Sequence, residues 1–500
     1  MNTLKRTLAL VATLAMSATA FVGCGSDDSS SEATTTAPAA TDAPTEGEEP
    51  TDGEEPTEGG NSTVEKSLEL GDIDSSLKTG GDTFTVAAWD ANDVPALLAA
   101  WKGETDLDAY KEKLANDEVS GIKFINFGVG GGQAAEQYNL LLNEGTDLDV
   151  YFCEADWALN YINDDTRTVG LDKLGFSDAN FAETYSYTDA IGKDENGVRK
   201  GVSWQAAGGG FAYRADLAEE YLGVKSPEEM QTKIGDWDKF VAAAETIADK
   251  TGNTVALADS LGGMWQAYAC GRTTPWVSND KVEIDATCEA FAKHAKTLWD
   301  CGGVTKNNQW SDAAWTASGV NGSCMGYFVS TWGYGGFFMD AAGGVNGDQY
   351  GKWAVCQGPV PYYWGGTWMV VHPNTDNAKE AQEFIFASTV DTAAMKAYAV
   401  SKPEFVNNSV AMAELIESDT VFNKDITGNF KDNQNIYAKL YDNVESIDFN
   451  GLITPYDAAC KTEFINAVRE TYLDGGKSWD ETKEDFLDKA SVVLPGLNWD

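Results

Sequence analysis

The sequence predicts an α/β fold in which a first unit of alternating strands and helices is followed by a second unit. Two patterns support this prediction. From residue 82 onward, short apolar runs rich in β-branched and aromatic residues alternate with segments of helical periodicity. Hydrophobic residues also make up 43% of the 500 residues, enough to fill large cores. A chain of this length holds two or more domains of the usual ~100–200 residues.

The first unit is expected to contain three strands with helices between them. In chain order these elements are strand 83–89, a helix from Val94, strand 122–127, helix 133–142 and strand 149–153. Strands joined through helices by short connections form a parallel sheet with helices on its faces. Ligands of such sheets bind beyond the carboxyl ends of the strands. Those ends carry Trp89, Asp90, the glycine-rich turn 128–132 and residues 154–157.

The second unit is expected to be richer in helices. Its elements are an extended segment at 203–214, a helix capped by Asp236, a helix at 286–299, a glycine- and tryptophan-rich segment at 310–368, and helices over 378–500. Trp237 and Trp299 fall on the apolar stripes of two of these helices, so we expect both to be core residues.

The charge of the chain excludes several function classes. Acidic residues number 79 against 35 Lys and Arg, a formal net charge of −44. Such a surface repels phosphate backbones, so we expect no nucleic-acid partner. The chain has two histidines, His294 and His372, far apart in sequence, which argues against a histidine-based metal site or catalytic triad. We expect neither a cofactor nor a catalytic metal.

The N-terminus has the pattern of a targeting signal. Lys5 and Arg6 precede an apolar run from Thr7 to Val22, which is shorter than the ~20 residues of a membrane span. The run ends just before Cys24 and resembles a bacterial lipoprotein signal, which predicts a signal segment at 1–23 and a lipidated Cys24. An ordinary cleaved signal peptide is the alternative.

Residues 24–80 are predicted to form a disordered acidic tether behind that cysteine. Between residues 25 and 65 there are twelve acidic residues and no Lys or Arg. Such a segment buries too little apolar surface to offset the entropy of ordering. A tether of this kind would hold a folded module away from a membrane, which favours the lipidated alternative.

The cysteines do not form a disulfide framework. Seven remain after Cys24, and an odd number cannot all pair within one chain. Cys288 and Cys301 flank one predicted helix and are the pair most able to bond, but we expect them to stay reduced.

Two motifs near the strand ends each allow two interpretations. The turn at 128–132 lies where a dinucleotide fingerprint would lie, but Gln133 replaces its third glycine, so a tight turn is the better interpretation. Glu154 and Asp156 are a possible glycosidase pair. Catalytic carboxylates flank the scissile bond, however, and two acids on one strand end do so poorly. We therefore favour two other roles over catalysis: hydrogen bonding to ligand hydroxyls or capping of the next helix.

Tryptophan provides the strongest indication of a ligand. Several of the 16 tryptophans lie beside glycine, at strand ends or in irregular segments. A flat ring beside polar groups suits a pyranose, whose C–H face packs on the ring while its hydroxyls form hydrogen bonds. The candidate ligand-binding residues are Trp89, Asp90, Glu154, Asp156, Trp157, Gln205, Trp265, Arg272, Trp310, Trp332, Tyr334, Trp364 and Trp368.

Four segments together resemble a known family. They are residues 147–152, 203–216, 358–368 and 404–408. Their order and spacing resemble the extracellular solute-binding lipoproteins of bacterial carbohydrate ABC importers, the maltose-binding-protein-like kind, over about residues 82–500.

The resemblance implies a two-lobed, type II periplasmic-binding-protein-like fold, with each lobe a sheet flanked by helices and a hinge between them. Lobe one is expected at 82–204 with 322–371, and lobe two at 205–321 with 372–500. The resemblance further implies a monomeric, non-enzymatic receptor on the extracellular face of the cell membrane. It would bind an oligosaccharide between the lobes and deliver it to the permease subunits of an ABC importer.

Two other functions remain open at this stage. A cell-surface glycoside hydrolase would use Glu154 or Asp156. A receptor for polyamines or other cations would suit the acidity of the chain, whereas the aromatic and glycine-rich segments favour neutral sugars.

Overall fold

The computed structural model describes residues 69–309, 313–335, 337–402, 404–418, 428, 430–447 and 452–498. The predicted signal segment, Cys24, the tether up to residue 68 and Trp310 lie outside these residues.

The first lobe is built on a five-stranded sheet with the order β2-β1-β3-β10-β4. Its strands are β1 (Phe84–Ala88), β2 (Ile122–Asn126), β3 (Val150–Glu154), β4 (Gly201–Ser203) and β10 (Thr367–Val371). As predicted, β1 pairs in parallel with β2 and β3, with Val86 opposite Phe124 and Val150. The sheet is nevertheless mixed, because β10 runs antiparallel to both β3 and β4.

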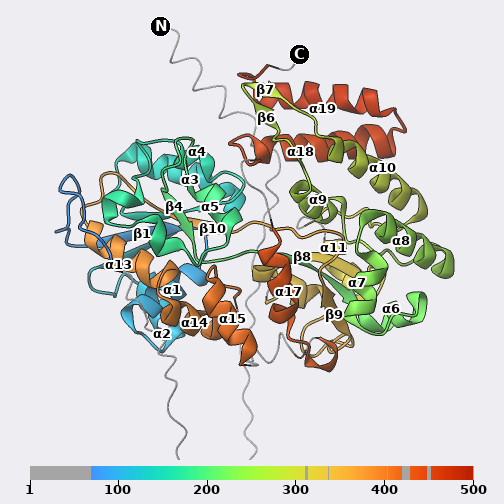
Figure 1. The fold of residues 1–500 in the computed structure, drawn as a ribbon, viewed down its shortest axis with the longest axis horizontal. Helices are drawn as coiled ribbons and strands as arrows, with labels where there is room; N and C mark the ends of the chain where they lie inside the picture. The colour runs from blue at the N-terminus through green and yellow to red at the C-terminus, as the bar shows by residue number, and fades with distance from the viewer. Residues whose placement is uncertain are drawn as a thin grey trace, which may run out of the picture. The chain divides into compact units, whose positions relative to one another are not determined.

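Helices cover the faces of this sheet. They are α1 (Asp93–Lys102), α2 (Leu107–Ala115), α3 (Gly131–Glu144), α4 (Leu159–Ile162), α5 (Ser186–Gly192), α13 (Ala378–Thr389) and α14 (Thr392–Ser401), with short 3-10 turns η1 (Leu171–Leu174) and η2 (Asp178–Phe181). Helix α1 contacts both α13 and α14, although nearly 300 residues of chain separate them. In Figure 1 these helices surround β1, β4 and β10.

The second lobe is built on a smaller antiparallel sheet, β8-β5-β9. Its strands are β5 (Gly209–Arg214), β8 (Gly326–Ser330) and β9 (Trp353–Cys356), and a separate hairpin joins β6 (Val277–Ser278) to β7 (Lys281–Val282). In Figure 1, α7, α11 and α17 lie beside β8 and β9, whereas α18 and α19 lie above them, next to β6 and β7. They are α6 (Ala215–Leu222), α7 (Pro227–Ile234), α8 (Trp237–Thr251), α9 (Leu261–Cys270), α10 (Ala286–Cys301), α11 (Ala313–Val320), α12 (Phe337–Ala341), α17 (Ile436–Glu445), α18 (Asp457–Ala467) and α19 (Trp479–Val493), with η3 (Thr331–Gly333), η4 (Lys431–Asn433) and the π-helix η5 (Val468–Asp474).

Helix α8 shows how local sequence defines these elements. Asp236 accepts a hydrogen bond from the backbone N–H of Lys239 at 2.8 Å, as the predicted cap requires. Gly252, at φ 64°, ends the helix in the left-handed conformation that glycine adopts most easily. Between them, the buried stripe includes Phe240, Ala244 and Ile247, which matches the predicted periodicity.

The chain crosses between the two sheets at residues 204–208, at residues 357–366 and between α14 and α17. The first two crossings lie side by side, because Gly208 bridges Tyr363 and Trp364 donates its backbone N–H to Ala207. The returning segment 404–407 joins them through the Gln205–Val406 bridge. Helix α15 (Ser409–Glu417) follows this segment and contacts both α14 and α17.

The sheets divide the chain differently from the predicted lobes in two segments. Residues 326–330 and 353–356, expected in lobe one, form β8 and β9 of the second lobe. Helices α13 and α14, expected in lobe two, pack on α1 of the first lobe. Both differences arise because long-range strand pairing and helix packing decide which sheet a segment joins, and periodicity contains no information on either.

All seven cysteines of the described part of the chain are free, including Cys288 and Cys301. No helix among the described residues combines the length and apolar character needed to cross a bilayer.

Candidate functional site

A small cavity of about 40 Å³ lies where the two lobes meet. Its lining comes from the end of β3, from helices α9 and α18, and from the crossing segment 362–366. The lining side chains with polar or aromatic groups are Asp156, Trp265, Gln266, Cys270, Arg272, Trp276, Tyr363, Asp457 and Lys461. The residues that follow the carboxyl end of β3, a central strand of the first sheet, thus line this cavity.

The first lobe contributes two carboxylates to this region. Glu154 is the last residue of β3, and its Oε2 accepts a hydrogen bond from the backbone N–H of Asp156 at 2.8 Å. Burial and the nearby Asp156 raise the pKa of Glu154 to about 8, although Lys461 opposes the shift. Glu154 therefore retains its proton near neutral pH. The side chain of Asp156 is 42% exposed to solvent.

The second lobe contributes a buried ion pair. Arg272 Nη2 donates to Asp457 Oδ2 at 2.7 Å, and the guanidinium lies over the Trp276 ring, 5.0 Å from its centroid. The other oxygen of Asp457 accepts hydrogen bonds from the backbone N–H and the hydroxyl of Thr454, at 2.8 and 2.7 Å. Arg272 and Asp457 side chains are 2% and 14% exposed, so this pair belongs to the interior of the lobe.

Lys461 connects the two lobes. Its ammonium donates to Asp156 Oδ2 and forms an ion pair that joins α18 to the segment after β3. Burial lowers the pKa of Lys461, but Asp156, Glu154 and Asp457 outweigh that effect and raise it. Lys461 therefore stays charged at neutral pH.

The predicted tryptophans differ in how much of the side chain is exposed to solvent, and one group is buried. Trp157, Trp265 and Trp368 are at most 7% exposed. The indole N–H groups of Trp157 and Trp368 donate to backbone carbonyls of Gly131 and Thr188, both at 3.1 Å. Trp265 packs among Trp276, Phe291 and Phe464 in the core of the second lobe and also lines the cavity.

Trp89 and Trp332 are more exposed than these residues, whereas Trp364 is buried beside Trp332. Trp89 is partly exposed and meets Trp157 edge to face, with ring centroids 6.0 Å apart. Trp332 is partly exposed, donates to the Trp364 carbonyl at 2.8 Å and meets the Trp364 ring at 5.8 Å. Trp364 is 8% exposed.

Of the remaining predicted residues, Asp90 caps a helix, Gln205 lies in the first crossing and Tyr334 lies in the core of the second lobe. Asp90 accepts backbone N–H bonds from Asn92 at 2.8 Å and Val94 at 3.2 Å at the start of α1. Gln205 is buried and donates to Glu404 at 2.9 Å. Tyr334 is fully buried against Phe338 and Phe430.

The glycine-rich turn is a packing feature, as its preferred interpretation predicts. Gly128 has φ 62° and Gly130 caps α3. A Cβ at Gly131 would lie 3.1 Å from the Trp89 indole and 3.3 Å from Glu154 Cγ. The turn therefore lets α3 approach the tryptophan at the end of β1.

Sequence reasoning missed Lys461, Asp457, Gln266 and Cys270 in this region. All four lie on helices α9 and α18. Asp457 and Lys461 are four positions apart, a spacing that is common for ion pairs on helix surfaces. The local sequence therefore does not distinguish them from ordinary surface residues.

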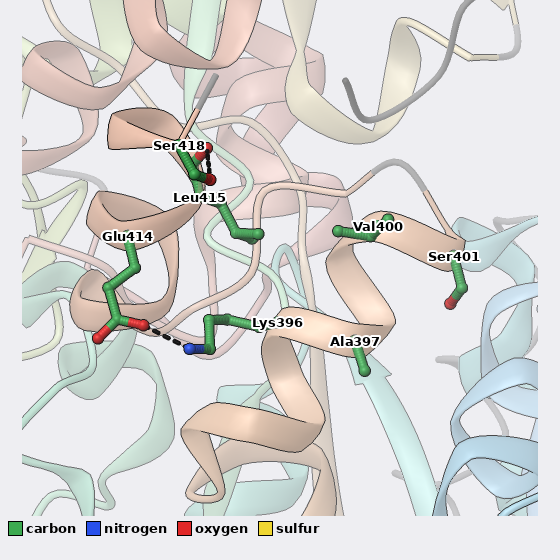
Figure 2. Close-up of a pocket in the computed structure, with 7 residues that line it drawn as sticks. All are labelled: Lys396, Ala397, Val400, Ser401, Glu414, Leu415 and Ser418. Carbon is green, nitrogen blue, oxygen red and sulfur yellow. Dashed lines mark hydrogen bonds and ion pairs between the residues drawn. The ribbon is translucent and has the colours of Figure 1, made fainter. Parts of the chain in front are cut away.

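Two larger hollows lie elsewhere in the described residues. One is a groove of about 640 Å³ between α14 and α15 (Figure 2). The seven residues drawn there contain an ion pair between Lys396 and Glu414 and aliphatic side chains such as Val400 and Leu415, with no aromatic ring among them. The other, about 400 Å³, contains Arg167 and His372 and lies by the opposite end of β3. Neither hollow shares a lining residue with the cavity at the end of β3.

A family comparison identifies the class of protein. The model for a family described as bacterial extracellular solute-binding proteins matches residues 107–422, more than half of the chain. The chain belongs to this family. Members of the family are binding proteins and act outside the cell or in the periplasm. No curated protein sequence matches the chain.

Solved structures share the fold at low sequence identity. The galacto-N-biose/lacto-N-biose I-binding protein of a Bifidobacterium longum ABC transporter, in complex with lacto-N-biose, is 17% identical, with TM-score 0.60 over 83% of this chain and 98% of that one. The sugar-binding protein MalE of Xanthomonas citri is 13% identical, with TM-score 0.61 over 83% and 98%. An ABC-transporter-associated binding protein of B. animalis subsp. lactis, in complex with β-1,6-galactobiose, is 16% identical, with TM-score 0.59 over 84% and 99%. These matches confirm the predicted two-lobed fold class of this solute-binding protein.

Proposed function

We propose that this solute-binding protein is a non-enzymatic receptor that binds a neutral oligosaccharide between its lobes and delivers it to the permease of an ABC importer. The observation that carries the proposal is the convergence of Asp156 from the first lobe with Arg272 and Lys461 from the second on one cavity at the end of β3. Solved proteins of the same fold are described in complex with disaccharides.

The chemistry of this region suits a sugar. Carboxylates and cations form hydrogen bonds with hydroxyls, and the partly exposed rings of Trp89 and Trp332 are available to pack on a pyranose face. Each ring contact adds about 0.5–1.5 kcal/mol beyond burial, and each net hydrogen bond contributes about as much. A few of each reach roughly −8 kcal/mol, which corresponds to micromolar affinity.

Binding of this kind requires the lobes to move. The cavity of about 40 Å³ is far smaller than the ~300–1,000 Å³ of ordinary ligand sites. A disaccharide therefore enters only when the lobes separate, and the crossings at 204–208 and 357–366 are the hinge we propose for this motion. Since contacts from both sides form only when the lobes close on the solute, the ligand favours closure.

We further propose that Cys24 is lipidated and that the acidic segment behind it tethers the receptor to the cell membrane. The arrangement of Lys5, Arg6, the apolar run and Cys24 supports this anchor. Intact mass of the protein purified from membranes would test it: a diacylglyceryl adduct at Cys24 is expected, and cleavage at a site without lipid would contradict it.

A thermal-shift screen followed by calorimetry tests the sugar assignment. Manno-, xylo-, cello- and malto-oligosaccharides, lacto-N-biose and β-1,6-galactobiose form the panel, with spermidine as the cationic probe. We expect stabilisation and micromolar binding with at least one neutral sugar. Stabilisation by spermidine alone would overturn the assignment.

One observation favours a glycoside hydrolase as a second candidate. The raised pKa of Glu154 is what a general acid needs, and Asp156 lies beside it. Both carboxylates nevertheless come from the same side of the cavity, and Asp156 is engaged by Lys461. Incubation with the same oligosaccharides separates the candidates, since shortened products would contradict the receptor.

A further inference from the structure

We propose that Lys461 is a specificity-determining residue whose ammonium acts as a built-in cation, excluding cationic solutes from the cavity between the lobes. The inference rests on the proposed function, because it explains how an acidic protein reserves its site for uncharged solutes. It assigns to Lys461 the position beside Asp156 and Glu154 that the positive end of a cationic ligand would occupy.

The long-range field of this protein attracts cations. The chain has a formal net charge of −44. A surface with such an excess of acid concentrates positively charged solutes near its clefts. Asp156 lines the cavity in the first lobe, and Glu154 lies directly behind it, with its Oε2 accepting the backbone N–H of Asp156 at 2.8 Å. A carboxylate in this position can bind an ammonium group.

Lys461 offsets the attraction of Asp156 for a cationic solute at the cavity. It projects from α18, one helical turn after Asp457, so that both side chains lie on the same side of the helix. Asp457 is satisfied within its own lobe by Arg272, whereas Lys461 reaches across to Asp156. The Lys461 side chain is 21% exposed, so its ammonium is held at the cavity rather than free in solvent.

The charges at the cavity then balance. Arg272 offsets Asp457, and Lys461 offsets Asp156. Because the pKa of Glu154 is raised to about 8, that carboxyl remains mostly protonated at neutral pH. A cationic ligand would therefore have to displace Lys461 before it gained a carboxylate, whereas the hydroxyls of a sugar gain hydrogen bonds without adding charge.

Calorimetric titration with spermidine tests the proposal at fixed pH and ionic strength. The variants are Lys461→Met and Lys461→Gln, which remove the charge, and Lys461→Arg, which keeps it. Lys483→Met is the matched control, because Lys483 pairs with Asp480 on α19 in the same lobe, outside the cavity lining. Circular dichroism and thermal unfolding show which variants are folded, and either charge-removing variant suffices.

We expect Lys461→Met and Lys461→Gln to bind spermidine at least about tenfold more tightly than the native protein, since a like charge a few ångströms away is removed. Lys461→Arg and Lys483→Met should match the native protein. Equal spermidine affinity in all five proteins would overturn the proposal, and so would micromolar spermidine binding by the native protein.

Titration of the native protein with the sugar panel separates this outcome from failure of the proposed function. If a sugar binds and the Lys461 variants gain no spermidine affinity, the inference about Lys461 fails while the receptor function stands. If no sugar binds and the native protein binds spermidine, both fail.

Discussion

Lysine or arginine pairs with aspartate both inside the second lobe and between the two lobes. The two ion pairs differ in burial and, we expect, in what they stabilise. Helix α18 presents both cases within one turn. Asp457 pairs with Arg272 inside the second lobe, where the two side chains are 14% and 2% exposed. Lys461 pairs with Asp156 across the lobes, where the two are 21% and 42% exposed. Because burial determines the cost of losing a partner, the first pair should govern folding and the second should govern how the lobes meet.

The largest effect is expected inside the first lobe, at Trp157. Its ring is 7% exposed and packs against Tyr138, Tyr161 and Trp89. Trp157→Ala should lower the free energy of unfolding by about 3–5 kcal/mol, because it leaves a large cavity in the core. Urea unfolding measures the loss. A variant as stable as the native protein would show that Trp157 belongs to the gap and not to the interior.

A loss of about 3 kcal/mol is expected inside the second lobe for Arg272→Ala, since the change leaves the Asp457 carboxylate without its cation in a mostly buried position. Urea unfolding again provides the readout. Arg469→Ala, at an exposed arginine on η5, is the control and should change stability by less than about 0.5 kcal/mol. If both substitutions lowered the free energy of unfolding equally, burial of the Arg272–Asp457 pair would not account for its contribution to stability.

A pH-dependent effect is expected at Glu404, in the segment 404–407 that joins the crossings. This carboxylate is 5% exposed and accepts hydrogen bonds from Gln205 and from the backbone N–H of Phe405, both at 2.9 Å. Burial, with Asp93 nearby, raises the pKa of Glu404 to about 8. Between the unfolded pKa of about 4.3 and this folded value, the native state retains a proton that the unfolded state has lost.

Glu404 therefore contributes stability that is fully present at acidic pH and is lost as the pH rises towards 8. The free energy of unfolding should fall in this range by up to about 1.4 kcal/mol per pH unit more steeply in the native protein than in Glu404→Gln. Urea unfolding of both proteins at pH 5, 6, 7 and 8 checks the slope. Parallel pH profiles would show that Glu404 titrates normally.

The smallest effect on stability is expected in the gap. Lys461→Met should change the free energy of unfolding by less than about 1 kcal/mol, because its partner Asp156 is substantially exposed. The same substitution should nevertheless alter ligand selection. Urea unfolding measures the change in stability. A loss for Lys461→Met as large as that for Arg272→Ala would contradict a role in ligand selection alone.

Local patterns in the sequence predicted the individual elements well. The strands β1, β2 and β3 and the helices α3, α8 and α10 occur where the periodicity and the Asp236 cap place them. These features depend on neighbouring residues, so the sequence contains the necessary information. The sheet to which β8, β9 and α13 belong depends instead on pairing across hundreds of residues, which no local pattern encodes.

In the candidate site too, some residues could be predicted from local sequence and others depend on long-range contacts. Glu154 and Asp156 could be found because strand ends in α/β sheets face the ligand. The tryptophan signal was less discriminating, since Trp157, Trp265 and Trp368 have the same local setting as Trp89 and Trp332 but lie in the cores. Lys461 is separated from Asp156 by 305 positions. Its importance arises from tertiary structure alone.

The most direct test of the account is the reactivity of Cys270, which lines the cavity between the lobes, while partly exposed Cys301 on α10 provides an internal reference. Maleimide labelling of both thiols, followed by peptide mass spectrometry, is measured with and without an oligosaccharide that stabilises the protein. At about ten times its Kd, the sugar should slow labelling of Cys270 by about tenfold and leave Cys301 unchanged. A stabilising sugar that leaves the labelling rate of Cys270 unchanged would contradict binding between the lobes.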